Sequence, residues 1–247
     1  MKRKYLITLS LFTLLFLTSF IEDNEKKNPS TVVLELFTSQ GCSSCPKADA
    51  LLGAIANDYT SKDILVLSYH VDYWNYIGWK DPFSKKEFTQ KQREYALKFN
   101  DNSIYTPAVV INGQEHFVGS NRSKMMSKIK EYQQKMSPYF VALQAKKETT
   151  NSVVFQYEIE GDISDLNARI VLAIKERLTK VTRGENAHKT LSNHHIVVLE
   201  SNIAEVLKKG KVVVQIPEIV NDKDKLIAFL ILENNQKDIL GGTKLQL

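Results

Sequence analysis

The chain has 247 residues, of which 43% are hydrophobic, so it can form one large or two small domains with apolar cores. Its formal charge is +5, but Lys2, Arg3 and Lys4 lie in a segment that we expect to be removed, and 5 − 3 leaves +2. The other basic residues alternate with acidic ones, as on a solvated surface. Nucleic-acid binding is therefore not expected.

Residues 1–20 have the pattern of a signal peptide. Three basic residues precede an apolar run from Tyr5 to Phe20, which is short and interrupted by Thr and Ser. Residues 21–30 follow as a polar linker. We expect an exported protein, periplasmic or extracellular, with no stable membrane span after signal removal. An uncleaved N-terminal anchor is the alternative.

Residues 31–136 alternate short apolar runs with helical patterns. Apolar residues recur with helical spacing after Pro46, Ser84-x-x-Glu87 is a possible capping box, and Asn121 or Ser123 can cap a last helix. Strands are expected at 32–37, 64–69, 108–111 and 115–118. The resulting order is β-α-β-α-β-β-α.

Residues 137–247 are dominated by strand patterns. In residues 153–159, for example, apolar and polar side chains alternate, which indicates a half-buried strand. Further strands are expected at 139–146, 168–175, 196–200, 211–216 and 226–233. Six short strands in succession suggest a small β-sandwich as the second domain.

Cys42 and Cys45 are the only cysteines, and two residues separate them. A bond between them closes almost no loop and adds little stability, which favours a chemical role. They follow a strand and precede a helix, whose N-terminal amides stabilise a thiolate. We expect Cys42 to be exposed and to attack a partner disulfide, and Cys45 to resolve the mixed disulfide. Half of a zinc site and an inert pair are the alternatives.

Glu35 is a carboxylate within an otherwise apolar strand. Its burial without a partner would be costly, so it is expected either to hold a proton or to be paired. It can accept the proton of Cys45 as that thiol attacks, or it can serve structure alone. Asp72 competes for the same role.

Four stretches, residues 34–46, 70–74, 78–84 and 103–107, resemble a domain-of-unknown-function family of secreted bacterial thioredoxin-like proteins. Residues 183–191 resemble the second signature of that family. The resemblance implies an α/β fold, with a thioredoxin-like domain at 31–136 followed by a β-rich, sandwich-like domain at 137–247. It supplies no substrate.

In thioredoxin-like domains a cis-proline opens the third strand and faces the cysteine pair, where its neighbour binds the substrate chain. Pro107 is placed for that role and Thr106 is the neighbour. An ordinary trans proline is the alternative.

His70, Asp72 and Trp74 belong to an aromatic-rich segment that extends to Trp79. The segment can hold a peptide or small thiol near the cysteines, or it can pack between the two domains.

His188, His194 and His195 lie close together in the sequence and could bind a metal, although loop histidines are more often ordinary polar residues. We expect no metal and no cofactor.

The sequence therefore predicts an exported thiol–disulfide oxidoreductase, whose partners are protein or small-molecule thiols and disulfides. A copper or zinc carrier and a binding module with a vestigial cysteine pair are the alternatives.

Overall fold

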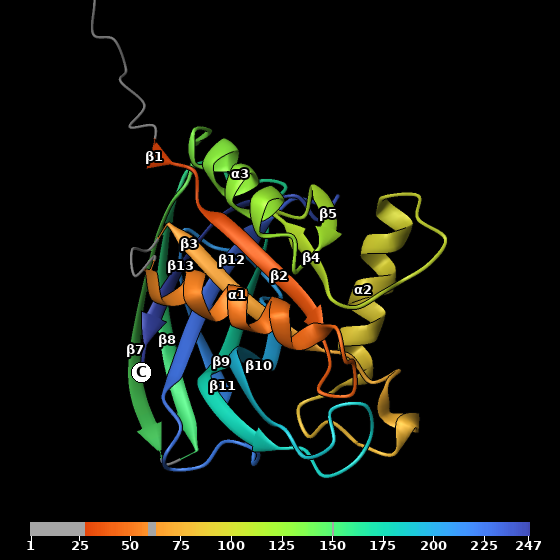
Figure 1. Cartoon of the computed structure of the whole chain (residues 1–247). Helices are drawn as coiled ribbons and strands as arrows, with labels where there is room; N and C mark the ends of the chain where they lie inside the picture. Colours follow the sequence, from red (N-terminus) through yellow and green to blue (C-terminus); the bar gives the residue numbers. More distant parts are fainter. Residues whose placement is uncertain (1–27, 59–62, 150) are drawn as a thin grey trace, which may run out of the picture.

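The computed structural model describes residues 28–58, 63–149 and 151–247, so the expected signal peptide and most of the linker lie outside the described residues. Strands take up 45% and helices 20% of the described part. Figure 1 shows helices around a large twisted sheet, with a smaller sheet at one side. No helix among the described residues is both long and apolar enough to cross a membrane.

The first half contains the helices. Its elements in chain order are β1 (Asn28–Pro29), β2 (Val32–Thr38), α1 (Cys45–Asp58), β3 (Ile64–His70), the 3₁₀ turn η1 (Asn75–Ile77), α2 (Lys86–Lys98), β4 (Ala108–Ile111), β5 (Glu115–Val118), α3 (Arg122–Gln133) and β6 (Met136–Ser137). The expected order of strands and helices is confirmed. Asn121 caps α3 by accepting a hydrogen bond from the Lys124 amide. The expected capping box does not form, because α2 has Lys85 at its N-cap and Ser84 donates to Asp81 instead.

The second half contains only strands among its described residues. They are β7 (Phe140–Thr149), β8 (Ser152–Glu160), β9 (Asn167–Lys180), β10 (Thr190–Asn202), β11 (Lys209–Gln215), β12 (Leu226–Glu233) and β13 (Ile239–Gln246). The six expected strands all occur, and β9 and β10 are longer than expected. β13 was not expected from the sequence, because it contains Gly241 and Gly242 and glycine is depleted in strands.

The expected architecture, a thioredoxin-like domain followed by a small β-sandwich, is wrong. The strands of both halves form one eight-stranded mixed sheet of order β13-β12-β9-β10-β3-β2-β4-β5. β10 joins β3 in parallel, with Ile196 opposite Ser68, and the Ser68 hydroxyl donates to the carbonyl of His194. The second half therefore covers the edge that β3 would otherwise expose to solvent. β11, β8 and β7 form a separate three-stranded sheet, and β1 pairs with β6 in a short two-stranded one.

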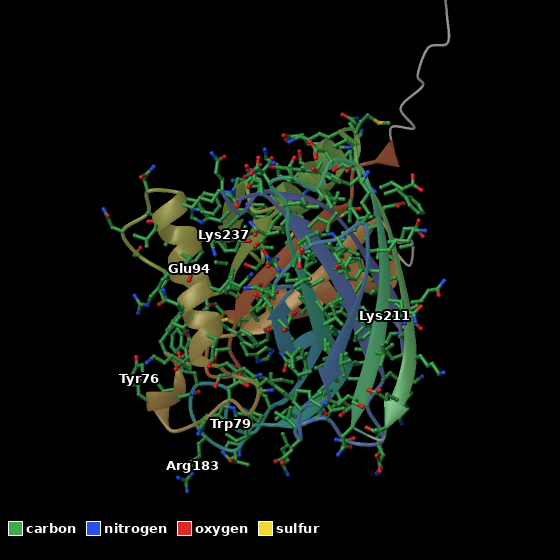
Figure 2. All side chains as sticks on the ribbon, turned by 180° about the vertical axis from the view of Figure 1, so that it is seen from behind. Tyr76, Trp79, Glu94, Arg183, Lys211 and Lys237 are labelled. Carbon is green, nitrogen blue, oxygen red and sulfur yellow. A yellow bond between two sulfur atoms is a disulfide. The ribbon has the colours of Figure 1, made fainter. Side chains whose placement is uncertain are left out.

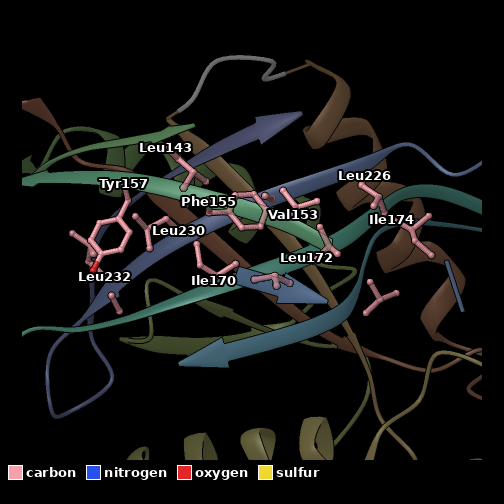
Figure 3. Close-up of a cluster of buried hydrophobic side chains, with 14 of the residues drawn as sticks. Leu143, Val153, Phe155, Tyr157, Ile170, Leu172, Ile174, Leu226, Leu230 and Leu232 are labelled. Carbon is pink, nitrogen blue, oxygen red and sulfur yellow. The ribbon is translucent and has the colours of Figure 1, made fainter. Parts of the chain in front are cut away.

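The three-stranded sheet packs against the large sheet through an extensive apolar core, which Figure 3 shows in close-up. This core includes Phe155 from β8, Leu172 from β9 and Leu230 from β12. α1 and α3 lie on the same face of the large sheet as the three-stranded sheet does, and they cover β2, β3 and β4. α2 covers the opposite face. The side of the sheet on which a residue lies therefore decides which helix it meets.

Candidate functional site

Cys42 and Cys45 form a disulfide at the start of α1, with their Cα atoms 5.4 Å apart. The expected position at a helix N-terminus is confirmed, since α1 begins at Cys45. The expected exposure of Cys42 is wrong, because both cysteines have 0% of their surface accessible. The two intervening residues, Ser43 and Ser44, are exposed. The disulfide thus lies just beneath the surface.

The two sulfurs differ in their relation to that surface. The Ser44 hydroxyl lies 3.4 Å from Sγ of Cys42 and donates to it, since a disulfide sulfur has no hydrogen. Cys45 lies within the helix and is buried together with Ala48 and Asp49. Sγ of Cys42 therefore contacts an exposed side chain.

A loop from the second half covers the disulfide. We call residues 181–189, between β9 and β10, the cap loop. The side-chain amide of Asn186 donates to the carbonyl of Gln40 at 3.0 Å and to that of Cys42 at 2.9 Å. Asn186 is fully buried, and its own oxygen accepts from Lys189. The cap loop is thereby fixed to the backbone of residues 39–44, between β2 and α1, which we call the cysteine loop.

Glu185 makes a second contact between the cap loop and the cysteine loop. Its carboxylate accepts a hydrogen bond from the Ser43 amide at 2.9 Å, and this contact lowers the pKa of Glu185. An anion is favoured at this point because the first amides of a helix have no partner within the helix. A Cys42 thiolate would be stabilised by the same partial positive charge at the helix start. In the closed cap loop, the Glu185 carboxylate therefore competes with the thiolate for this charge.

Gln40 links the cysteine loop to three other segments. Its backbone amide donates to the carboxylate of Asp81 at 2.8 Å, and its side-chain amide donates to the side-chain oxygen of Asn193 in β10 at 3.0 Å. Its side-chain oxygen accepts from the indole of Trp79 at 3.2 Å. Gln40 is itself 1% exposed, so the residues that precede Cys42 are held in one conformation.

His70 is fully buried at the end of β3, and its Nδ1 lies 2.7 Å from the carboxylate of Asp81. Burial alone would lower the pKa of His70, but the charge and hydrogen bond of Asp81, together with the charge of Asp49, outweigh it and the pKa is raised. Burial alone would raise the pKa of Asp81, but the charge and hydrogen bond of His70, together with two backbone hydrogen bonds, outweigh it and the pKa is lowered. The two residues thus form a buried pair behind the cysteine loop, in which each favours the charged form of the other.

Asp49 lies one helical turn after Cys45. Its side chain accepts a hydrogen bond from the Thr38 hydroxyl at 3.0 Å. Burial raises the pKa of Asp49 to about 6, although the neighbouring His70 acts in the opposite direction. A buried carboxyl group that titrates near neutral pH is a common property of functional sites.

Glu35 lies on the opposite face of the sheet from α1. It packs towards α2, where it pairs with Arg169 of β9 at 2.9 Å and accepts a hydrogen bond from Tyr95. Lys91 is also within 3.5 Å. Side chains alternate along a strand, so Glu35 and Thr38 point to opposite faces. Its partners favour the structural interpretation of Glu35.

Of the remaining predicted site residues, Trp74, Thr106 and Pro107 lie near one another, whereas Asp72 lies elsewhere. The indole of Trp74 donates to the Thr106 hydroxyl at 2.8 Å, which brings these two together, and the Thr106–Pro107 bond is cis. Pro107 lies near the start of α1, since a Cβ added at Gly119 would contact both Ala48 and Pro107. Asp72 is instead directed towards α2, where it bonds Thr89.

The aromatic segment packs between the two halves of the chain. A Cβ added to Gly184 of the cap loop, where φ is +74°, would lie 3.3 Å from Cβ of Trp79. Figure 2 shows Trp79 and Arg183 of the cap loop at the same end of the molecule as Tyr76, which is 83% exposed. These contacts support the alternative that this segment packs between the two halves of the chain.

The three histidines of the second half do not converge. Nδ1 of the buried His195 lies 2.9 Å from the carbonyl of Val66, whereas His194 approaches Ser192. Within the described ranges, no three His, Cys, Asp or Glu side chains form a group suited to a metal ion.

Asp49, Asp81, Gln40 and Asn186 were not identified by sequence reasoning. Asp49 occupies a polar position in a helix and gives no signal of burial. Gln40, Asp81 and Asn186 lie inside the stretches that carried the family resemblance, and those stretches were the signal available for finding them.

Three comparisons place the chain among known proteins. Residues 33–231 match the model of a family described as "Protein of unknown function (DUF1223)". A structural-genomics protein of Agrobacterium tumefaciens is 28% identical, with a TM-score of 0.62 over 88% of this chain and 95% of that one. HBP35 of Porphyromonas gingivalis is 15% identical, with a TM-score of 0.60 over 89% of this chain and 76% of that one, and shows likeness of fold only. Among curated proteins, no relative matches the chain.

Proposed function

Because the chain belongs to the DUF1223 family of proteins of unknown function, its activity must be inferred from its own site, and we propose that it is a thiol–disulfide oxidoreductase. The Cys42–Cys45 disulfide carries the proposal. The two cysteines are three positions apart at the beginning of a helix. The bond therefore restricts the unfolded chain very little and adds little stability. The helix amides favour a thiolate at that point.

Exchange follows from this geometry in two steps. A substrate thiolate attacks Sγ of Cys42, which forms a mixed disulfide, breaks the Cys42–Cys45 bond and releases Cys45 as a thiolate that takes up a proton. A second substrate thiolate then attacks the substrate sulfur, so the substrate leaves as a disulfide and the protein keeps two thiols. The reverse sequence reduces a substrate disulfide. The contact of Cys42 with the exposed Ser44 supports Cys42 as the attacked sulfur.

The buried disulfide adds a requirement for access. A substrate sulfur reaches Cys42 only after the cap loop moves, because Asn186 and Glu185 contact the cysteine loop. Movement of Glu185 also releases the Ser43 amide, which can then stabilise a thiolate. Export through the N-terminal signal, which we continue to expect, would place the protein where disulfides persist.

A binding module with an inert disulfide is the second candidate, and the 0% exposure of both cysteines favours it. In that case the disulfide fixes the surface on which the cap loop packs. The protein would then contain the cysteine pair without exchanging it.

A redox titration distinguishes these functions. The mature chain is equilibrated with glutathione buffers of increasing ratio, and its thiols are alkylated and counted by mass spectrometry. An oxidoreductase shows a reversible two-electron transition and catalyses reduction of a model disulfide, whereas the Cys42→Ser/Cys45→Ser double variant does neither. A cysteine pair that stays oxidised in every buffer and transfers no electrons contradicts the proposal and favours the binding module.

A further inference from the structure

We propose that Asp49 holds and returns the proton of Cys45 during exchange, as part of a buried polar group formed with Thr38, His70 and Asp81. This inference rests on the proposed function. It assigns to a helix residue the role that sequence reasoning gave to Glu35 or Asp72.

Cys45 and Asp49 lie close together in α1. They are four positions apart in the helix, and both are buried on the side that faces the sheet. Such a pair lies on one helix face, with Cβ atoms about 5–6 Å apart. Glu35 points to the opposite face of the sheet and is occupied by Arg169.

In the part of the chain that the structure describes, two buried polar atoms at this place have no hydrogen-bond partner, Oδ1 of Asp49 and Nε2 of His70. The other oxygen of Asp49 accepts from Thr38, and Thr38 is the direct neighbour of His70 across β2 and β3. A buried polar atom without a partner is costly, so it needs a reason to persist. A carboxyl oxygen that alternately binds and releases a proton supplies one.

His70 and Asp81 are the charged groups that act on Asp49, His70 favouring its ionised form and Asp81 opposing it. The hydrogen bond from Thr38 favours the ionised form, and the nearby Asn193 side chain acts in the same direction. The pKa of Asp49 is about 6, so the group gives or takes a proton readily at neutral pH.

The proton balance is complete in both directions. When a substrate thiolate attacks Cys42, Cys45 leaves with the electron pair of the broken disulfide, and its thiolate takes the proton of the Asp49 carboxyl group. In the reverse direction the Asp49 carboxylate removes the proton of Cys45 as that sulfur attacks Cys42, and the substrate leaves as a thiolate. Through the opened cap loop, bulk water returns a proton to Asp49 after the first direction and takes one from it after the second.

Asp49→Asn tests the inference, because it keeps the shape of the side chain and removes the titrating group. Asp58→Asn is the matched control, since Asp58 is exposed at the far end of the same helix. Single-turnover reduction of a model disulfide by the reduced protein is followed at intervals of about one pH unit from pH 5 to pH 9, which brackets the region where the Asp49 carboxyl titrates. We expect Asp49→Asn to slow resolution by roughly 10²-fold and to remove the inflection near the pKa of Asp49, with Asp58→Asn unchanged.

A second readout does not depend on turnover. In the reduced protein, the ultraviolet absorbance of the Cys45 thiolate is titrated in the Cys42→Ser background. Removal of the nearby negative charge by Asp49→Asn is expected to make this thiolate appear at lower pH. If wild-type protein exchanges disulfides but Asp49→Asn changes neither readout, the inference is wrong. If the thiolate titration changes while no variant transfers electrons, the proximity of Asp49 and Cys45 stands and the proposed function fails.

Discussion

The side-chain amide of Asn186 donates a hydrogen bond to the carbonyl of Cys42, 144 residues earlier in the chain. The same amide group donates to Gln40, so one buried residue of the second half fixes the backbone on both sides of Gly41. The two halves of the chain therefore meet at the disulfide as well as along the shared sheet. Access to the disulfide depends on this contact.

Asn186→Ala is expected to speed the reduction of the disulfide by dithiothreitol about tenfold or more, because loss of both hydrogen bonds, worth about 1 kcal/mol each, favours the open cap loop. The rate is measured by timed alkylation and mass spectrometry. Asn202→Ala, at an exposed position of β10, is the control. An unchanged rate in Asn186→Ala would show that the cap loop does not limit access.

The cysteine roles make a separate prediction. Cys45→Ser is expected to accumulate a stable mixed disulfide between Cys42 and a thiol probe, because the resolving thiol is missing. Cys42→Ser is expected to accumulate far less, since Cys45 lies in the helix and Cys42 contacts the exposed Ser44. Intact-mass analysis after incubation with oxidised glutathione measures both. Accumulation on Cys45 instead would reverse the roles.

Local elements were predictable because their signals are local. The apolar run at β2 and the helical spacing after Pro46 each indicate one element, and both were found. The joining of the halves was not predictable, since β3 and β10 are both buried strands and a single parallel pair, Ser68 with Ile196, connects them across 128 residues (196 − 68). A strand pattern specifies which face is buried, and it does not specify the neighbouring strand.

The site shows the same division. The cysteine pair and its place at a helix start follow from a short motif. The partners of buried polar groups depend on the tertiary fold. Glu35 was expected either to hold a proton or to be paired, and nothing in the strand that contains Arg169 indicated that Arg169 is its partner. Asp49 was missed for the same reason, because its burial depends on how α1 packs against β2 and β3.

Glu35→Gln is expected to destabilise the protein by about 3–5 kcal/mol, because it leaves the buried Arg169 without one of its carboxylate partners. The exchange rate of the folded fraction is expected to stay unchanged, since Glu35 lies on the face opposite α1. Urea unfolding gives the first quantity and single-turnover exchange the second. Slower exchange with unchanged stability would restore Glu35 as a candidate proton acceptor.

The last prediction concerns the pH dependence of stability, and its sign follows from Asp49. Burial raises the pKa of Asp49 from 3.8 to about 6, so between these values the folded protein binds more protons than the unfolded chain. The contribution of protonated Asp49 to the free energy of unfolding is fully present below pH 4 and is lost as the pH rises through 6. A difference of about two pH units, at about 1.4 kcal/mol each, makes ionised Asp49 cost about 3 kcal/mol at neutral pH.

Asp49→Asn removes this cost, because an amide cannot ionise. Its stability relative to wild type is therefore expected to increase by about 3 kcal/mol between pH 4 and pH 8, as measured by urea unfolding of the oxidised proteins. Thr38→Val is the control in the same site, since it removes a hydrogen bond but keeps the titrating carboxyl group. A constant difference between Asp49→Asn and wild type would mean that Asp49 is ionised at low cost, as in an ordinary structural contact. A residue that lowers stability at neutral pH is instead what a site retained for its chemistry is expected to contain.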